Sequence, residues 1–215
     1  MLRRLALATL LLPLAACGDK AADGGGGAAK PAGKSASDVR AELQAAPLSG
    51  VMAARPAGST VEFEARVIDE DKSLVAIVPK GWEESKGIPG RFKPPSNSDF
   101  GFMTSFSVGT NCDGMCSPKD WKATAEKVDL AQFRDPAKFT IVSETDMTAP
   151  TGKMLQATSA GGGFGGPKTY LTMVRWKDGA DRYQTCRATL EGETANALLP
   201  AFQKACEAAV VMELQ

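Results

Sequence analysis

Two thiols separated by three residues have the clearest chemistry in this sequence. Cys112 and Cys116 enclose Asp113, Gly114 and Met115, a short turn that can bring the two β-carbons together. Such a pair can form a structural disulfide, take part in thiol exchange, or bind Cu(I), for which the Met115 thioether is a further soft ligand. The spacing therefore leaves a structural and a chemical interpretation open.

The chain contains no histidine. This absence excludes nearly every zinc site, haem site, and Ser-His-Asp or Cys-His catalytic scheme. Acidic runs such as 69–71 and 83–84 have the pattern of solvated turn charges. We therefore predict no catalytic residue, no metal site and no cofactor, and we favour a structural disulfide between Cys112 and Cys116.

A glycine-rich stretch, Gly161 to Gly166, contains the pattern G-x-G-x-x-G. A dinucleotide site needs a strand before this pattern and a helix after it, so that the pyrophosphate meets a helix N-terminus. Here the pattern is followed by Pro167 to Tyr170, where a strand begins. We expect a hairpin connection rather than a nucleotide site.

The fifth cysteine, Cys17, follows the most apolar stretch of the chain. Arg3 and Arg4 precede an apolar run over residues 5–14. This run of about ten residues suits a signal peptide and is well short of the roughly 20 residues that span a bilayer. The sequence LAAC at residues 14–17 resembles the lipobox of bacterial lipoproteins.

This resemblance implies that residues 1–16 are cleaved and that Cys17 receives acyl chains. Two or more chains anchor a protein stably to membrane lipid, because each buried methylene contributes about 0.8 kcal/mol. In enterobacterial lipoproteins, an aspartate directly after the cysteine favours the inner membrane. Here Gly18 has that place and Asp19 follows, so we expect the outer membrane of the bacterial cell envelope, on its periplasmic side.

In an exported domain, an even number of thiols favours disulfides, and four cysteines allow three pairings. Cys186 shares a strand face with Ala188 and Leu190, which should face the core. Cys206 lies on the apolar face of a predicted closing helix, so it can meet Cys186 in the core. We predict the disulfide Cys186–Cys206 together with Cys112–Cys116.

Composition divides the chain into three regions: the signal peptide 1–16, a tether 17–37 and one globular domain 38–215. The tether is rich in Gly, Ala and Lys and lacks large apolar residues, so we expect it to be disordered, with a reach of about 20–25 Å. Loss of the signal peptide changes 25 basic and 25 acidic residues to 23 and 25. The mature charge of about −2, with no basic run after the tether, gives nucleic-acid binding no electrostatic support.

Alternating apolar residues predict a sheet. The expected strands are 60–68, 73–78, 100–108, 139–143, 153–159, 169–176 and 182–190. Residues 177–181, which include Asp178-Gly179, predict a hairpin loop between the last two. The residues Phe92, Phe100, Phe102 and Phe106 form an aromatic set that we assign mainly to the core, with a partner-binding patch as the alternative.

Helices are expected at both ends of the domain and in its middle. Residues 38–46 predict a short helix that Pro47 ends. Ser117 is the expected cap of a helix whose apolar stripe is Trp121, Ala125 and Val128. Residues 194–212 predict a closing helix, in which Pro200 either causes a kink or marks the start of the regular part. The predicted class is α+β, an antiparallel sheet with helices packed on it.

The segment 78–82, VPKGW, directly follows a predicted buried strand. It is similar to the P-x-G-W segment of the PsbP-like fold, which includes the DcrB-type envelope lipoproteins. That fold is an antiparallel sheet sandwiched by helices, with a final hairpin and a closing helix that residues 169–209 match. The resemblance implies a non-catalytic accessory or binding domain and transfers no site residue.

Three hypotheses follow. The leading one is a membrane-anchored envelope lipoprotein whose domain binds an envelope protein. The alternative is a periplasmic thiol-redox or copper-handling protein that uses Cys112 and Cys116. A small-ligand or hydrolytic protein whose site has no sequence signature is the third.

Overall fold

The computed structural model describes residues 34–69, 74–112, 120–161, 165–211 and 214. Residues Lys34–Gln215 form one compact unit. Among the residues described, no helix is long and apolar enough to cross a membrane. Cys17 and nearly all of the predicted tether lie outside the described residues, so the leader and tether boundaries stay predictions.

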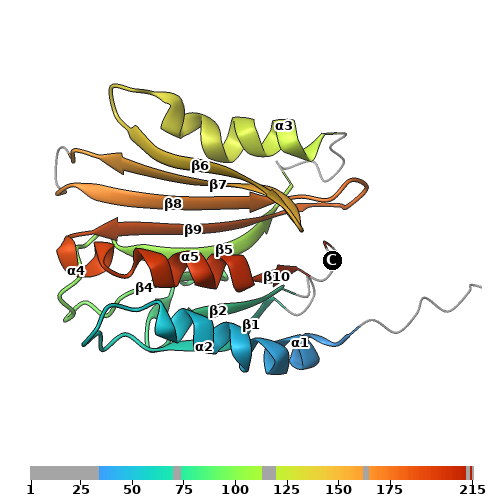
Figure 1. Cartoon of the computed structure of the whole chain (residues 1–215), viewed down its shortest axis with the longest axis horizontal. Helices are drawn as coiled ribbons and strands as arrows, with labels where there is room; N and C mark the ends of the chain where they lie inside the picture. Colours follow the sequence, from blue (N-terminus) through green and yellow to red (C-terminus); the bar gives the residue numbers. More distant parts are fainter. Residues whose placement is uncertain (1–33, 70–73, 113–119, 162–164, 212–213, 215) are drawn as a thin grey trace, which may run out of the picture. The chain divides into compact units, whose positions relative to one another are not determined.

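A seven-stranded antiparallel sheet forms the centre of this unit (Figure 1). Its strand order is β3-β4-β5-β9-β8-β7-β6. The bounds are β3 Glu83–Glu84, β4 Arg91–Lys93, β5 Ser105–Asn111, β6 Thr140–Thr148, β7 Thr151–Ser159, β8 Lys168–Arg175 and β9 Tyr183–Glu191. The strands predicted between residues 139 and 190 are confirmed, and Gly179, with a φ of 79°, lies in the predicted loop between β8 and β9.

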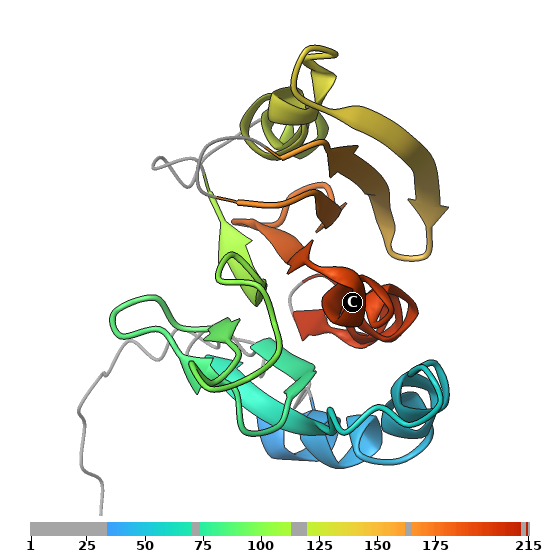
Figure 2. The same ribbon diagram turned by 90° about the vertical axis from the view of Figure 1, so that its left-hand side faces the viewer.

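A second, three-stranded sheet has the order β1-β2-β10. Its bounds are β1 Phe63–Asp69, β2 Leu74–Pro79 and β10 Val210–Val211. Four helices accompany it: α1 Ala36–Leu43, α2 Ala46–Ala53, α4 Glu193–Asn196 and α5 Leu199–Ala208. In Figure 2, α5 lies between the large sheet on one side and β2 and α2 on the other, and it packs against β8, β9, β2 and α2.

Phe202 is at the centre of the main core. Its side chain is fully buried, and its ring centroid lies 5.6 Å from Phe63, 5.6 Å from Trp82 and 5.1 Å from Phe106. These rings come from β1, the turn after β2, and β5. One aromatic side chain on α5 therefore joins the two sheets.

The opposite face of the large sheet has its own core. It is covered by α3 Trp121–Ala125, the π-helical turn η1 Glu126–Leu130 and the 3-10 turn η2 Ala131–Arg134. Trp121, Leu130 and Phe133 pack there with Leu155 and Tyr183 from the strands. The large sheet thus has helices on both faces, which confirms the predicted α+β class.

The N-terminal helices differ from the prediction. The single helix predicted over 38–46 is replaced by α1 and α2, and Pro47 does not end a helix. It lies in the first turn of α2, where its missing N–H is not needed. At the C-terminus, Pro200 likewise lies in the first turn of α5, so of the two predicted alternatives the structure has the helix start near Pro200 and not the kink. The closing helix is shorter than predicted, because Val210 and Val211 pair with Val75 and Leu74 of β2.

The predicted helix after Ser117 also differs. Ser117 lies outside the described residues, and Asp120 caps α3 by accepting a hydrogen bond of 2.9 Å from the Ala123 N–H. Val128 is 36% exposed rather than buried, while Asp129 and Leu130 are fully buried. The π-helical turn explains the shift, because one extra residue per turn rotates the following side chains around the helix axis.

The predicted strand 100–108 begins only at Ser105. Phe100 and Phe102 precede it in a tight loop, in which the Thr104 N–H donates to the Gly101 carbonyl over 2.9 Å. The short strands β3 and β4 lie between the predicted strands 73–78 and 100–108, where no strand was expected.

Candidate functional site

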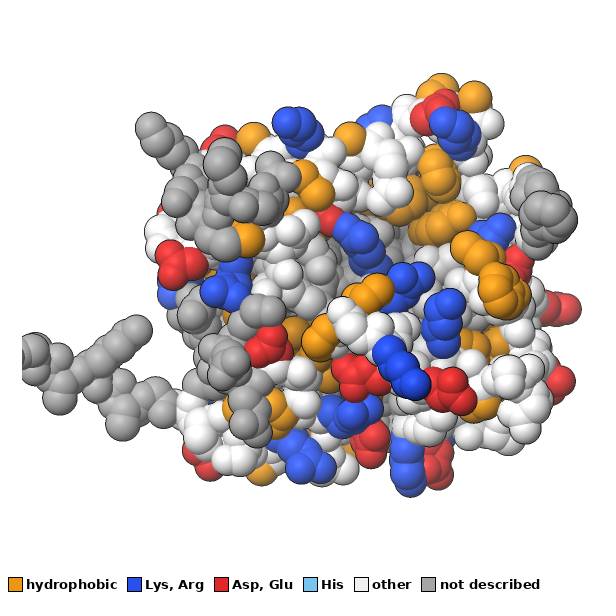
Figure 3. All heavy atoms as spheres, turned by 180° about the vertical axis from the view of Figure 1, so that it is seen from behind, with side chains coloured by type: hydrophobic (Ala, Val, Ile, Leu, Met, Phe, Trp, Pro, Cys, Tyr) orange, Lys and Arg blue, Asp and Glu red, His pale blue; other side chains and the backbone are white. Residues whose placement is uncertain are grey.

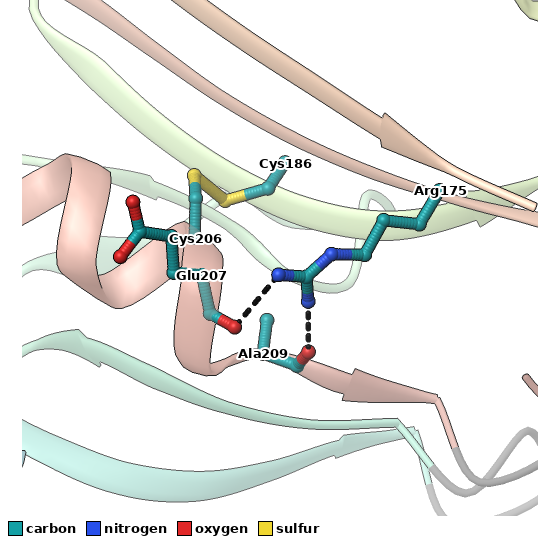
Figure 4. Close-up of a disulfide and its surroundings, with 5 residues drawn as sticks. All are labelled: Arg175, Cys186, Cys206, Glu207 and Ala209. Atoms are coloured by element: carbon teal, nitrogen blue, oxygen red, sulfur yellow. Dashed lines mark hydrogen bonds between the residues drawn. A yellow bond between two sulfur atoms is a disulfide. The ribbon is translucent and has the colours of Figure 1, made fainter. Parts of the chain in front are cut away.

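A disulfide joins Cys186 of β9 to Cys206 of α5 (Figure 4), as predicted. Both residues are fully buried, and their Cα atoms are 5.5 Å apart. Ala188 and Leu190 are buried on the same strand face, which is the position that the alternation predicted. The bond ties the closing helix to the sheet.

Arg175 of β8 lies beside this disulfide (Figure 4). Its guanidinium donates to the carbonyls of Glu207 at 2.8 Å and Ala209 at 3.0 Å. These carbonyls are at the end of α5, where backbone acceptors lack helical partners. Burial lowers the pKa of Arg175. The cluster therefore secures the helix end, and no nucleophile is exposed in it.

The other predicted cysteine pair is described only in part. Cys112 is disulfide-bonded, and its predicted partner Cys116 lies outside the described residues, as does Met115. Within the described part of the chain, no three His, Cys, Asp or Glu side chains lie together as a metal site would require. The Cys112–Cys116 pairing stays a prediction.

The glycine-rich stretch joins two antiparallel strands. Gly161 follows β7 and Gly166 precedes β8, and these strands pair from Gly152 with Arg175 to Ser159 with Lys168. Residues 162–164 lie outside the described residues. A strand, β8, follows the glycines where a dinucleotide site would need a helix, as expected for a hairpin connection.

The four phenylalanines of the aromatic set separate into core and surface. Phe92 and Phe106 are fully buried. Phe100 is partly buried and packs edge-on against Trp82, with centroids 5.5 Å apart. Phe102 is 85% exposed, and its neighbour Met103 is 47% exposed. The prediction that most of the set is core holds for Phe92 and Phe106, while Phe102 is a surface residue.

Glu191, at the end of β9, fixes the loop that carries Phe102. Its carboxylate accepts a hydrogen bond from the Met103 N–H at 2.9 Å and a second from the Gly166 N–H at 2.9 Å. Its carbonyl accepts from the Gly101 N–H at 3.3 Å. A β-carbon at position 101 would lie 2.4 Å from Cγ of Glu191, so glycine is required there. The loop is held in one conformation while Phe102 projects into solvent.

A hollow of about 330 Å³ lies beside the Phe102 ring. Lys93 contributes to its wall, and its ammonium lies 5.7 Å from the centroid of the ring, within the range of a cation–π contact. We call the set Lys93, Pro94, Pro95, Phe100 and Phe102 the Phe102 surface. It combines an exposed aromatic ring, two prolines and one positive charge.

A second hollow, of about 460 Å³, lies on the large sheet over β4, β5 and β9. Arg91 is the register partner of Ser107, and Ser107 is the register partner of Arg187, so the three residues form one row across three strands. Hydroxyl groups of Ser105, Thr185 and Thr189 also line the hollow. We call it the sheet groove. Figure 3 shows the face of the molecule opposite to that in Figure 1, with Lys and Arg side chains gathered across its hollowed middle.

A buried carboxylate positions Arg187. Asp129 of η1 is fully buried and forms an ion pair with the Arg187 guanidinium. Its other oxygen accepts a 2.6 Å hydrogen bond from the Tyr183 hydroxyl, which in turn accepts one of 2.9 Å from the Asn111 amide. Burial lowers the pKa of Arg187, whose side chain remains 40% exposed. One side of the guanidinium is thus held and the other faces the groove.

Neither hollow was predicted from the sequence. The only signal for Phe102 was its place in an aromatic set beside Pro94 and Pro95. Arg91 and Arg187 had no signal, because their proximity depends on the register of three strands.

The sequence matches no family model and no curated protein. Among solved structures, it is similar to the Ran-binding protein Mog1p of Saccharomyces cerevisiae, with a TM-score of 0.49 and 10% identity over 71% of this chain and 96% of that one. It is also similar to cyanobacterial PsbP (CyanoP) of Synechocystis sp. PCC 6803, with a TM-score of 0.48 and 13% identity over 73% and 96%. A third, the Pseudomonas aeruginosa protein of unknown function PA94, has a TM-score of 0.40 and 13% identity over 66% and 92%. No function is transferred from them.

Proposed function

We propose that this chain is a lipid-anchored lipoprotein of the bacterial cell envelope, with a non-catalytic domain that binds a protein partner through the Phe102 surface. The observation that carries the binding proposal is the 85% exposure of Phe102 on a loop that Glu191 fixes. Aromatic residues are enriched at protein interfaces and dominate their energetics. Because the backbone of this loop is already held, covering the ring with a partner costs less ordering entropy than it would on a free loop.

The composition of the Phe102 surface indicates a protein as the ligand. The hollow beside the ring is lined by Pro94, Pro95 and Phe100 as well as the ring itself. An apolar projection next to an apolar hollow is complementary to a partner that offers a pocket for the ring and a ridge for the hollow. Lys93 and Glu83 at its margin are suited to a polar rim.

Replacing Phe102 by alanine is expected to reduce partner capture strongly without affecting the fold. A photo-crosslinking residue at position 103, which is 47% exposed, should give one discrete adduct in intact cells. Loss of a central aromatic contact costs about 2 kcal/mol or more, so F102A should reduce the adduct at least tenfold. Its free energy of unfolding should change by less than about 0.5 kcal/mol.

The matched control is V142A, because Val142 is also exposed, at 54%, and lies on the edge strand β6. This variant should leave the adduct unchanged. An adduct that persists in F102A, or that V142A weakens equally, would contradict the proposed binding surface.

The lipid anchor is tested at Cys17, whose place in the sequence LAAC supports it. Mass spectrometry of the membrane fraction should find a mature chain that begins at Cys17 and carries acyl groups. C17A should accumulate as an uncleaved or soluble precursor, since the acceptor thiol is missing. Fractionation of the two membranes should place the native protein in the outer membrane. A mature N-terminus elsewhere, without lipid, would refute the anchor.

A further inference from the structure

We propose that the sheet groove binds a small polar molecule through its carboxylate, held between Arg91 and Arg187. This site is separate from the Phe102 surface and its use requires no protein partner. Arg91 and Arg187 flank Ser107 in one row of the sheet. Adjacent strands are about 4.8 Å apart, so the two backbone positions are roughly 10 Å apart, and two side chains of arginine length can meet on one oxyanion between them.

The charge of the groove favours a monoanion. Among the described residues that line it, two are arginines and none is acidic. The buried carboxylate of Asp129 forms an ion pair with Arg187, so the groove together with Asp129 has a net charge of about +1. A carboxylate matches that charge, whereas a phosphate dianion would remain partly uncompensated after losing its hydration.

The ion pair with Asp129 also prepares Arg187 for this role. A free arginine side chain loses considerable rotamer entropy when it is fixed. Here the buried Asp129 carboxylate, which the Tyr183 hydroxyl holds by a hydrogen bond, fixes the guanidinium before any ligand arrives. The exposed side of the guanidinium then presents its N–H groups in the planar geometry that suits a carboxylate.

The size and lining of the groove identify the rest of the ligand. A volume of about 460 Å³ is within the usual range for small-molecule sites and is larger than acetate needs. The hydroxyls of Ser105, Ser107 and Thr189, together with the Asn111 amide, line it. These groups form hydrogen bonds with hydroxyl or amide groups, so a polyhydroxy monocarboxylate is the chemical class that fills the groove.

The test is calorimetric titration of the full chain in nonionic detergent at constant ionic strength. The probes are gluconate as polyhydroxy monocarboxylate, acetate as minimal carboxylate and inorganic phosphate as dianion. We expect gluconate to bind at least tenfold more tightly than acetate and phosphate. R91Q should weaken gluconate binding about tenfold or more, because a charge-assisted hydrogen bond is lost.

Two further variants make the result specific. K93Q removes the same charge from the same strand, but Lys93 lines the Phe102 hollow instead of the groove, so it should change gluconate affinity less than twofold. R187K keeps a cation for Asp129 and loses the fork, so it should weaken binding about as much as R91Q does. Absence of gluconate binding, equal losses in R91Q and K93Q, or tighter binding of phosphate would overturn the proposal. Partner capture at Phe102 is measured separately, so the two sites can fail independently.

Discussion

Replacing Phe202 by alanine is expected to lower the free energy of unfolding by about 3–5 kcal/mol, because it empties the centre of the main core. The ring packs against Phe63, Trp82 and Phe106 at centroid distances of 5.1–5.6 Å. Its loss removes contacts between the two sheets. Urea unfolding of the full chain in detergent, followed by circular dichroism, measures the change. Since a typical domain is stable by only about 5–15 kcal/mol, F202A should be a marginal protein.

The comparison with F102A makes this prediction sharp. Both changes replace a phenylalanine by alanine, but Phe202 is fully buried and Phe102 is 85% exposed. The expected pattern is a large stability loss for F202A and partner loss without a stability loss for F102A. Similar midpoints for F202A and the native chain would show that α5 does not join the two sheets as described.

The hairpins of the second half were predictable because the information is local. From residue 139 to residue 190, each strand has a partner that is next in the chain, and the Asp178-Gly179 loop has its own turn chemistry. Local alternation also places Cys186 on the core face. Its meeting with Cys206 then follows from the apolar face of the closing helix.

Elements that depend on distant partners were missed. The strands β3, β4 and β10 have two or three residues each, which is too short for periodicity, and they exist because a neighbouring strand offers backbone groups. Phe100 and Phe102 continue the alternation of β5 in the sequence. In the structure the strand begins only at Ser105, because Glu191 forms hydrogen bonds with the Gly101–Thr104 loop that precedes it.

The two hollows illustrate the same limit. Arg91 and Arg187 flank Ser107 in one row only because of the strand register. Asp129 reaches Arg187 because a π-helical turn brings it inward, whereas the predicted apolar stripe of this helix was Trp121, Ala125 and Val128 and did not include position 129. Sites of this kind depend on strand register and on irregular helix geometry. A single sequence does not reveal either of them when no local motif marks the residues.

Removing the buried disulfide is the second large effect expected. The double variant C186A/C206A should lose about 3 kcal/mol of unfolding free energy, because the bond closes a loop with a sequence separation of 20 and restricts the unfolded chain. Alanine is the better replacement at these fully buried positions, since a serine hydroxyl would be left without a partner. The measurement is urea unfolding of the full chain in detergent, without and with a reducing agent.

The matched variant C112A/C116A decides between structure and chemistry at the other pair. The loop between Cys112 and Cys116 encloses only three residues, so the chain-entropy contribution is smaller and the stability loss should be clearly less than for C186A/C206A. Reducing agent should destabilise the native chain by about as much as the loss of both bonds together, and it should not affect a variant that lacks all four thiols. If C112A/C116A proves the more destabilising variant, the closing helix is not held mainly by Cys186–Cys206. If Cys112 and Cys116 titrate as free thiols in the native exported protein, or bind Cu(I) tightly, their disulfide assignment is wrong and the thiol-redox or copper function replaces it.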